Sequence, residues 1–228
     1  IRWARPGAEP IPPEDFLPVA ERAGLMRTLG RLVIEAVCAQ LARWAGDPAT
    51  AGLTVALNVS ASQLYQPGFA DETLAAIHRS GAPARCLVVE LTESLVLSDM
   101  EAAIAVMRRL LAHGIRFSID DFGTGYSSLA YLHQLPLDEL KIDRSFVCDL
   151  PDNPNSLAIV KTIVALARTL GLRVIAEGVE APRQMETLLH NGCTSFQGYM
   201  FHRPLPIDAF AALPGIGGAA PPSPAEDA

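Results

Sequence analysis

The sequence has few cysteines, few lysines and no long hydrophobic run, and each scarcity excludes a class of protein. Its four cysteines are scattered without Cys-x-x-Cys spacing, so we expect reduced, mostly buried thiols rather than a disulfide framework or a zinc site. No apolar stretch approaches the roughly 18 residues of a membrane span, and no signal peptide is visible. We therefore expect a cytoplasmic chain without a membrane segment, which leaves open whether a longer parent protein is tethered.

Positive charge is also scarce, because 25 acidic residues face 18 basic ones and the net charge is −7. Such a chain is a poor candidate for binding duplex DNA, which needs a broad basic surface. A small anionic ligand remains compatible, because a metal site can supply local positive charge. Lys141 and Lys161 are the two lysines among these basic residues, and Lys141 falls at the end of an expected strand, where a compact amine has chemical uses that arginine lacks.

Half of the 228 residues are hydrophobic, and they fall into short apolar runs that alternate with longer segments of helical spacing. Near-continuous apolar strands that alternate with helices are typical of a parallel sheet covered by helices. The expected strands are 53–59, 86–91, 115–119, 139–142, 172–176 and 194–197. The expected helices are 71–80, 99–113, 127–134, 155–170, 182–190 and 206–212, preceded by two helices within 13–45 that break near Gly24.

Six expected strands leave two architectures open. One is an open doubly wound sheet, and the other is an eight-stranded (β/α) barrel from which two strands are missing. The last residues, 214–228, are rich in glycine, proline and alanine and lack periodicity, so we predict a disordered tail there.

Polar residues at the strand ends carry the functional signal. The apolar strands finish in polar or charged residues, namely Asn58, Glu90, Asp120 with Asp121, Lys141 with Asp143, Glu177 and Gln197. In a parallel barrel all strand carboxyl ends open onto one face, which holds the active site. Any single one of these residues has a simpler explanation as a helix cap or a surface ion pair, but the pattern recurs on six strands.

Converging carboxylates repel one another and need protons, cationic side chains or metal ions to balance them. No histidine or cysteine pair lies at a strand end, so the available ligands are oxygens, which favour Mg²⁺ or Mn²⁺ over zinc. Adjacent Asp120 and Asp121 could serve two metal ions, as in phosphoryl transfer. The Gly-rich segment 123–128 after them is either a mobile loop near phosphates or a tight turn.

The segments around these residues, taken together, resemble the EAL-domain cyclic di-GMP phosphodiesterases. The segments are NVSASQL (58–64), ELTES (90–94), DDFGTGYSSL (120–129), KIDRSFV (141–147), AEGVE (176–180) and QGYMFHRPLP (197–206). The resemblance runs from residue 1 to about 213 and implies a TIM-like (β/α)₈ barrel, here without its first two strands, as the phosphodiesterase domain 1–213. It also implies a homodimer and an upstream sensory or GGDEF domain in the parent protein.

The same resemblance implies a role for each site residue. Asn58, Glu90 and Asp120 would hold a first metal ion, and Asp120 would bridge to a second that Asp121 and Glu177 complete. Lys141 would orient or activate the attacking water, and Gln197 would place a water or the substrate. Four further residues are implied around the centre: Arg2 as a phosphate contact, Asp143 as a support at the rim, Pro204 at the guanine pocket, and Glu93 as the anchor of the 123–128 loop.

The sequence departs from the family in one respect, because it does not contain the Glu-Ala-Leu triplet that names the family. That triplet would lie just upstream of Ile1, and its glutamate would supply a further metal ligand. We expect the sequence to start partway through its domain, and a chain that truly began at Ile1 to be inactive and poorly stable. Two other functions stay open: an inactive relative that senses cyclic di-GMP, and an unrelated two-metal phosphoesterase or scaffold on a similar barrel. An inactive relative would usually have lost several of the carboxylates at the strand ends. An unrelated phosphoesterase or scaffold would not explain why all of the motifs occur together.

Overall fold

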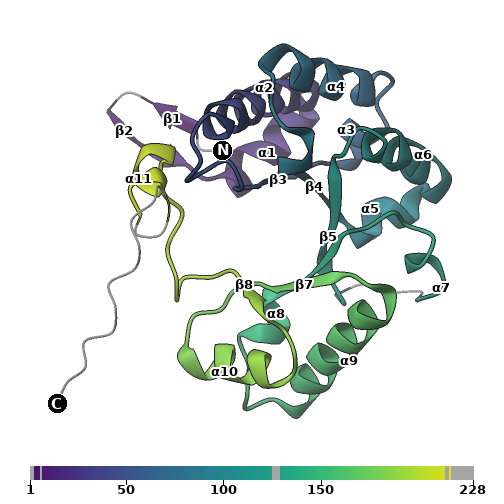
Figure 1. The fold of residues 1–228 in the computed structure, drawn as a ribbon, viewed down its shortest axis with the longest axis vertical. Helices are drawn as coiled ribbons and strands as arrows, with labels where there is room; N and C mark the ends of the chain where they lie inside the picture. Colours follow the sequence, from purple (N-terminus) through teal and green to yellow (C-terminus); the bar gives the residue numbers. More distant parts are fainter. Residues whose placement is uncertain (1–2, 6, 125–128, 214–215, 217–228) are drawn as a thin grey trace.

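The computed structural model describes residues 3–5, 7–124, 129–213 and 216 of the chain. Its main sheet has six parallel strands in the order β3-β4-β5-β6-β7-β8, so each strand lies beside its neighbours in sequence. These strands are β3 (Val55–Asn58), β4 (Leu87–Thr92), β5 (Arg116–Phe122), β6 (Glu139–Ile142), β7 (Arg173–Ala176) and β8 (Ser195–Phe196). They form an incomplete barrel with helices on its outer side, which confirms the predicted architecture (Figure 1).

Helices alternate with these strands much as the sequence predicts. The longer ones are α1 (Pro13–Arg22), α2 (Met26–Ala45), α4 (Phe69–Ser80), α6 (Met100–Leu111), α9 (Pro154–Leu170) and α10 (Pro182–His190). Gly81 and Gly171 end α4 and α9 with φ of 72°, a left-handed conformation that glycine adopts without steric cost. The two helices expected within 13–45 are α1 and α2, and they separate at Gly24.

Several short elements were not predicted, because three to six residues show no clear periodicity. They are α3 (Ala61–Leu64), α5 (Glu93–Ser98), α8 (Arg144–Val147) and the 3₁₀ turn η1 (Ala84–Cys86). The short helices α7 (Leu129–Leu132) and α11 (Ile207–Ala211) lie within longer predicted ones. At the start of the chain, β1 (Trp3–Arg5) and β2 (Ala8–Ile11) form an antiparallel hairpin, which the sequence analysis missed.

The core lies around the central strands. Leu87, Val89 and Leu91 of β4 are at most 1% exposed, and Val88, which points the other way, is 3% exposed. Strands buried on both faces are expected of a parallel sheet covered by helices, and burying these side chains supplies the main driving force for the fold. This packed core gives the strand ends a rigid base.

The cysteine and membrane predictions can be compared directly with the structure. Cys38, Cys86 and Cys193 are buried, Cys148 is exposed, and all four thiols are free. No helix among the described residues combines the length and the apolar character needed to cross a bilayer. The predicted disordered tail lies outside the described residues, apart from Ile216.

Candidate active site

The carboxyl ends of the parallel strands bring the predicted polar residues to one edge of the sheet. Asn58 ends β3, Glu90 lies in β4, and Lys141 is the next-to-last residue of β6. Glu177 directly follows β7, and Gln197 directly follows β8. Asn58 and Glu90 are partners in the β3–β4 register, so they lie at the same level of the barrel. The side chains therefore gather at one mouth of the barrel, as the sequence predicts.

Lys141 forms the centre of this arrangement. Its Nζ lies 2.6 Å from Oε1 of Glu177, 2.8 Å from Oε1 of Glu90 and 3.1 Å from Oδ1 of Asp120. The lysine side chain is only 4% exposed. An ammonium group has three donors on a compact charge, so it can serve three carboxylates at once. Carboxylates from three strand ends thus meet the ammonium group that a fourth strand supplies.

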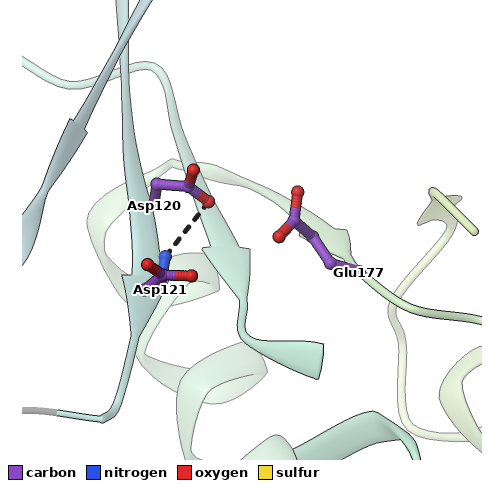
Figure 2. Close-up of side chains that lie close together, drawn as sticks. All are labelled: Asp120, Asp121 and Glu177. Carbon is purple, nitrogen blue, oxygen red and sulfur yellow. Dashed lines mark hydrogen bonds between the residues drawn. The ribbon is translucent and has the colours of Figure 1, made fainter. Parts of the chain in front are cut away.

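A local break in β5 lets two adjacent aspartates serve the same site. Neighbouring residues of a regular strand point to opposite faces. Asp121, however, has φ of 54°, in the left-handed region that aspartate tolerates better than most residues, and the β5–β6 register is irregular between Ile119 and Phe122. The N–H of Asp121 donates to Oδ1 of Asp120 at 3.1 Å. Figure 2 shows both carboxylates on the side of the strand that faces Glu177.

The geometry fits a site for hard divalent cations. One oxygen each from Asp120, Asp121 and Glu177 can be chosen so that all three lie within 4.8 Å of one another. Three carboxylate oxygens without nitrogen or sulfur suit Mg²⁺ or Mn²⁺. Asn58 and Glu90 extend the cluster, because Nδ2 of Asn58 donates to Oε2 of Glu90 at 2.9 Å while Glu90 also contacts Lys141.

The pKa values of Glu90, Glu177 and Lys141 are all raised in this site. Burial raises the pKa of Glu90 and of Glu177, and the opposing attraction to Lys141 does not cancel this effect. Burial by itself would lower the pKa of Lys141, but the charges of Glu90 and Glu177 outweigh it and raise that pKa. The lysine therefore stays protonated, and the site as a whole favours further positive charge.

The pKa values of Asp121 and Asp143 shift in opposite directions. Burial, the negative charge of Asp120 and the bond to Asp143 raise the pKa of Asp121 to about 6. Burial also acts to raise the pKa of Asp143, but hydrogen bonds from the Ser145 hydroxyl and backbone N–H lower it overall. Asp143 also caps α8 through that Ser145 N–H at 2.9 Å. The helix-cap explanation considered for each strand-end residue therefore applies to Asp143, at least in part.

A cleft of about 530 Å³ opens beside Glu177 and is lined by Gln197 and Pro204, two of the predicted substrate contacts. Arg144 and Arg203 line it as well, and neither was predicted as a site residue from the sequence. Arg144 directly follows Asp143 and lies two residues beyond the end of β6, so its position in the sequence is a signal that could have indicated it. The guanidinium of Arg203 lies 4.5 Å from the centre of the Tyr199 ring, and no sequence pattern predicts this cation–π contact.

Two predicted roles cannot be compared with the structure. Arg2 lies outside the described residues, as do residues 125–128 of the Gly-rich loop. Glu93 is the first residue of α5, directly after β4, and is half-buried. Its part as an anchor of that loop stays a prediction.

Comparison with known proteins identifies the family. The family model for the EAL domain matches residues 1–204. MucR of Pseudomonas aeruginosa, a bifunctional diguanylate cyclase/cyclic di-GMP phosphodiesterase, is 42% identical over 212 residues, which cover 93% of this chain and 31% of MucR. The cyclic di-GMP phosphodiesterase NbdA of the same organism is 41% identical over 211 residues, 92% of this chain and 27% of NbdA. The chain thus spans about a third or less of these relatives.

A solved structure agrees with the sequence matches. The PaMucR phosphodiesterase in complex with c-di-GMP superimposes with a TM-score of 0.86 at 42% identity, over 92% of this chain and 84% of that one. The family match, the incomplete parallel barrel and the carboxylates at its strand ends agree with one another, and the chain belongs to the EAL domain family.

Proposed function

We propose that this protein hydrolyses cyclic di-GMP to linear pGpG with the help of two divalent metal ions, Mg²⁺ or Mn²⁺. The observation that carries the proposal is the cluster of Asp120, Asp121 and Glu177 around buried Lys141, in a chain of the EAL domain family. Relatives named as cyclic di-GMP phosphodiesterases support the substrate. Bound metal ions would lower the pKa of a water molecule and offset charge on the phosphoryl oxygens.

The chain's own residues would hold the ions and the water. In the proposal Asn58, Glu90 and Asp120 would hold one ion, and Asp120, Asp121 and Glu177 would hold the other. The raised pKa values of Glu90, Asp121 and Glu177 support these assignments, because burial and neighbouring carboxylates disfavour their ionised forms, which a bound cation would stabilise. Protons would compete with the cation for these carboxylates, so metal binding would weaken in acid.

Lys141 would orient the attacking water while it balances the charge of the carboxylates. Its raised pKa keeps the ammonium protonated, so in this proposal it acts as a hydrogen-bond donor and not as the base. Gln197 and Pro204 would contact the substrate in the cleft beside Glu177, and Asp143 would support the rim through Asp121. Arg2 would contact a phosphate, and Glu93 would anchor the loop.

The proposal extends to the surroundings of the chain. Residues 1–213 would form the phosphodiesterase domain, which would act as a homodimer within a longer protein that carries a sensory or GGDEF domain. MucR, a bifunctional relative of which this chain spans 31%, supports the presence of such a partner domain. Since cyclic di-GMP is an intracellular messenger, the domain would work in the cytoplasm.

Hydrolysis of cyclic di-GMP by the full-length protein tests the function. We expect pGpG, detected by chromatography, with Mg²⁺ or Mn²⁺ and none with EDTA. Glu177→Gln should lower the rate by at least about 100-fold, because it removes a charge that faces the reacting centre. Glu186→Gln, which neutralises an exposed carboxylate on α10, is the matched control and should leave the rate unchanged.

Circular dichroism of both variants would show that they remain folded. If the folded protein binds cyclic di-GMP but produces no pGpG with either metal, the phosphodiesterase assignment fails and a cyclic di-GMP receptor takes its place. If it neither binds nor hydrolyses cyclic di-GMP, both assignments fail, and a phosphoesterase with another substrate or a scaffold on the same barrel remains.

A further inference from the structure

A second cleft, of about 770 Å³, lies away from the carboxylates, between α9 and the beginnings of β7 and β8. Its polar lining includes Lys161, Arg168, Arg173, Asn191, Thr194 and Ser195. Lys161 and Arg168 are seven residues apart on α9 and therefore lie on one face of that helix. Arg173 is the first residue of β7, whereas Glu177 follows its last residue. This basic cleft and the metal-type cluster thus lie at opposite ends of β7.

The charge of this cleft is unusual for the protein. Three cationic side chains line it and none of the described residues that line it is acidic, although the chain as a whole has a net charge of −7. A cleft of about 860 Å³ on α2 and α4 provides the contrast. There Arg27, Arg31 and Arg79 are interleaved with three acids, and the ion pairs Arg27–Glu72 and Arg79–Glu35 use two of the arginines.

The cations of the basic cleft are largely available. Within the described part of the chain, Lys161 and Arg168 form no ion pair, and both are exposed. Arg173 is different, because its Nη2 lies 2.9 Å from Oε2 of Glu139, a residue only 4% exposed. Two cations are therefore free to meet an anion, and the third is anchored at the floor of the barrel with most of its side chain exposed.

We propose that the basic cleft binds a small phosphate-bearing anion of the pyrophosphate type. An arginine fork and a lysine point charge are the side chains that phosphate groups recruit, and two or three cations match the charge of a diphosphate. The volume of the cleft falls in the range typical of small-molecule sites, about 300–1,000 Å³. The side chains of Asn191, Thr194 and Ser195 add polar groups at its edge.

Direct binding tests this proposal independently of any catalytic activity. The full-length protein would be titrated with inorganic pyrophosphate by calorimetry, with divalent metal ions removed. We expect saturable binding that weakens with salt. Lys161→Gln and Arg168→Gln should each lower the affinity about tenfold, and the double variant more, since one charge-assisted contact is typically worth that factor. Arg173 is left intact, because its removal would leave the buried Glu139 carboxylate unpaired.

The matched control removes two charges from the other cleft through Arg31→Gln with Arg79→Gln, and it should bind pyrophosphate as the unmodified protein does. If the control variant lost as much affinity for pyrophosphate as the Lys161 and Arg168 variants, the attraction would depend only on net charge and the proposal would be overturned. The absence of pyrophosphate binding to the unmodified protein would overturn it as well. A parallel binding experiment with phosphatidylserine vesicles distinguishes a soluble phosphate-bearing ligand from a lipid headgroup. Vesicle binding that depends on Lys161 and Arg168, without pyrophosphate binding, would replace the soluble ligand by a lipid headgroup.

Discussion

Replacing Lys141 with methionine removes the cation that holds together the buried carboxylate of Glu90 and the partly buried carboxylates of Asp120 and Glu177. Methionine keeps much of the length and volume of lysine, so the change chiefly deletes the charge. Glu90, Asp120 and Glu177 then face one another without the ammonium that now lies 2.6–3.1 Å from each. Breaking a buried ion pair by removing one partner typically costs about 3–5 kcal/mol of unfolding free energy.

This loss should be visible as a lower midpoint of thermal unfolding. Each kcal/mol shifts the midpoint by about 2–4 °C in a domain of this size, so the metal-free variant should unfold roughly 6–20 °C below the parent. Carboxylates with raised pKa values destabilise the folded state once they ionise, so stability falls as pH rises through those values. The deficit should therefore be largest at neutral pH and smaller in acid. Divalent metal ions should also reduce it by restoring positive charge.

Calorimetry of Lys141→Met with EDTA, with Mn²⁺ and at several pH values measures each of these effects. Lys161→Met is the matched control, because it deletes the other lysine from an exposed position on α9 where the described structure shows no ion pair. That control should change the midpoint by no more than about 2 °C. An unchanged midpoint for metal-free Lys141→Met at neutral pH would refute the view that this lysine balances the cluster.

Two other features of the site give sharp expectations. Metal affinity should weaken as pH falls below about 6, because the raised pKa of Asp121 lets protons compete with the metal, and Mn²⁺ titrations that show no such trend would contradict the assignment. Gly198→Ala should destabilise the protein by about 1–3 kcal/mol or more, because the new Cβ would lie 2.1 Å from the backbone oxygen of Val179 next to the cleft. Gly52→Ala, which has open space around it, serves as the control in the same melting experiment, and equal melting of the two variants would argue against tight packing there.

The strands and longer helices could be predicted because each carries a local signal. The predicted bounds of 139–142 and 182–190 coincide with β6 and α10, and an N-terminal proline marks the start of α10. The β1–β2 hairpin was missed because Pro10 lies within β2, and proline argues against a strand unless the strand lies at an edge. The short helix α8 was missed because one turn has no period to detect.

For the site, the sequence alone determined which residues lie at the strand ends and that their ligand atoms are oxygens. Short, near-continuous apolar runs fix the position of each polar residue along its strand, and parallel strands place those positions on one edge. The structure bears out the convergence of Glu90, Asp120, Lys141 and Glu177.

Only the tertiary structure decided how these residues meet. That one lysine contacts three carboxylates depends on the curvature of the sheet, which no local pattern encodes. That Asp120 and Asp121 serve the same site depends on the left-handed backbone at Asp121 and on the irregular register beside it. The basic cleft at the other end of β7 likewise joins α9 to residues some 30 positions later in the chain. Sequence fixes the order and chemistry of groups through local energies, whereas distances between strands arise only when the whole core packs.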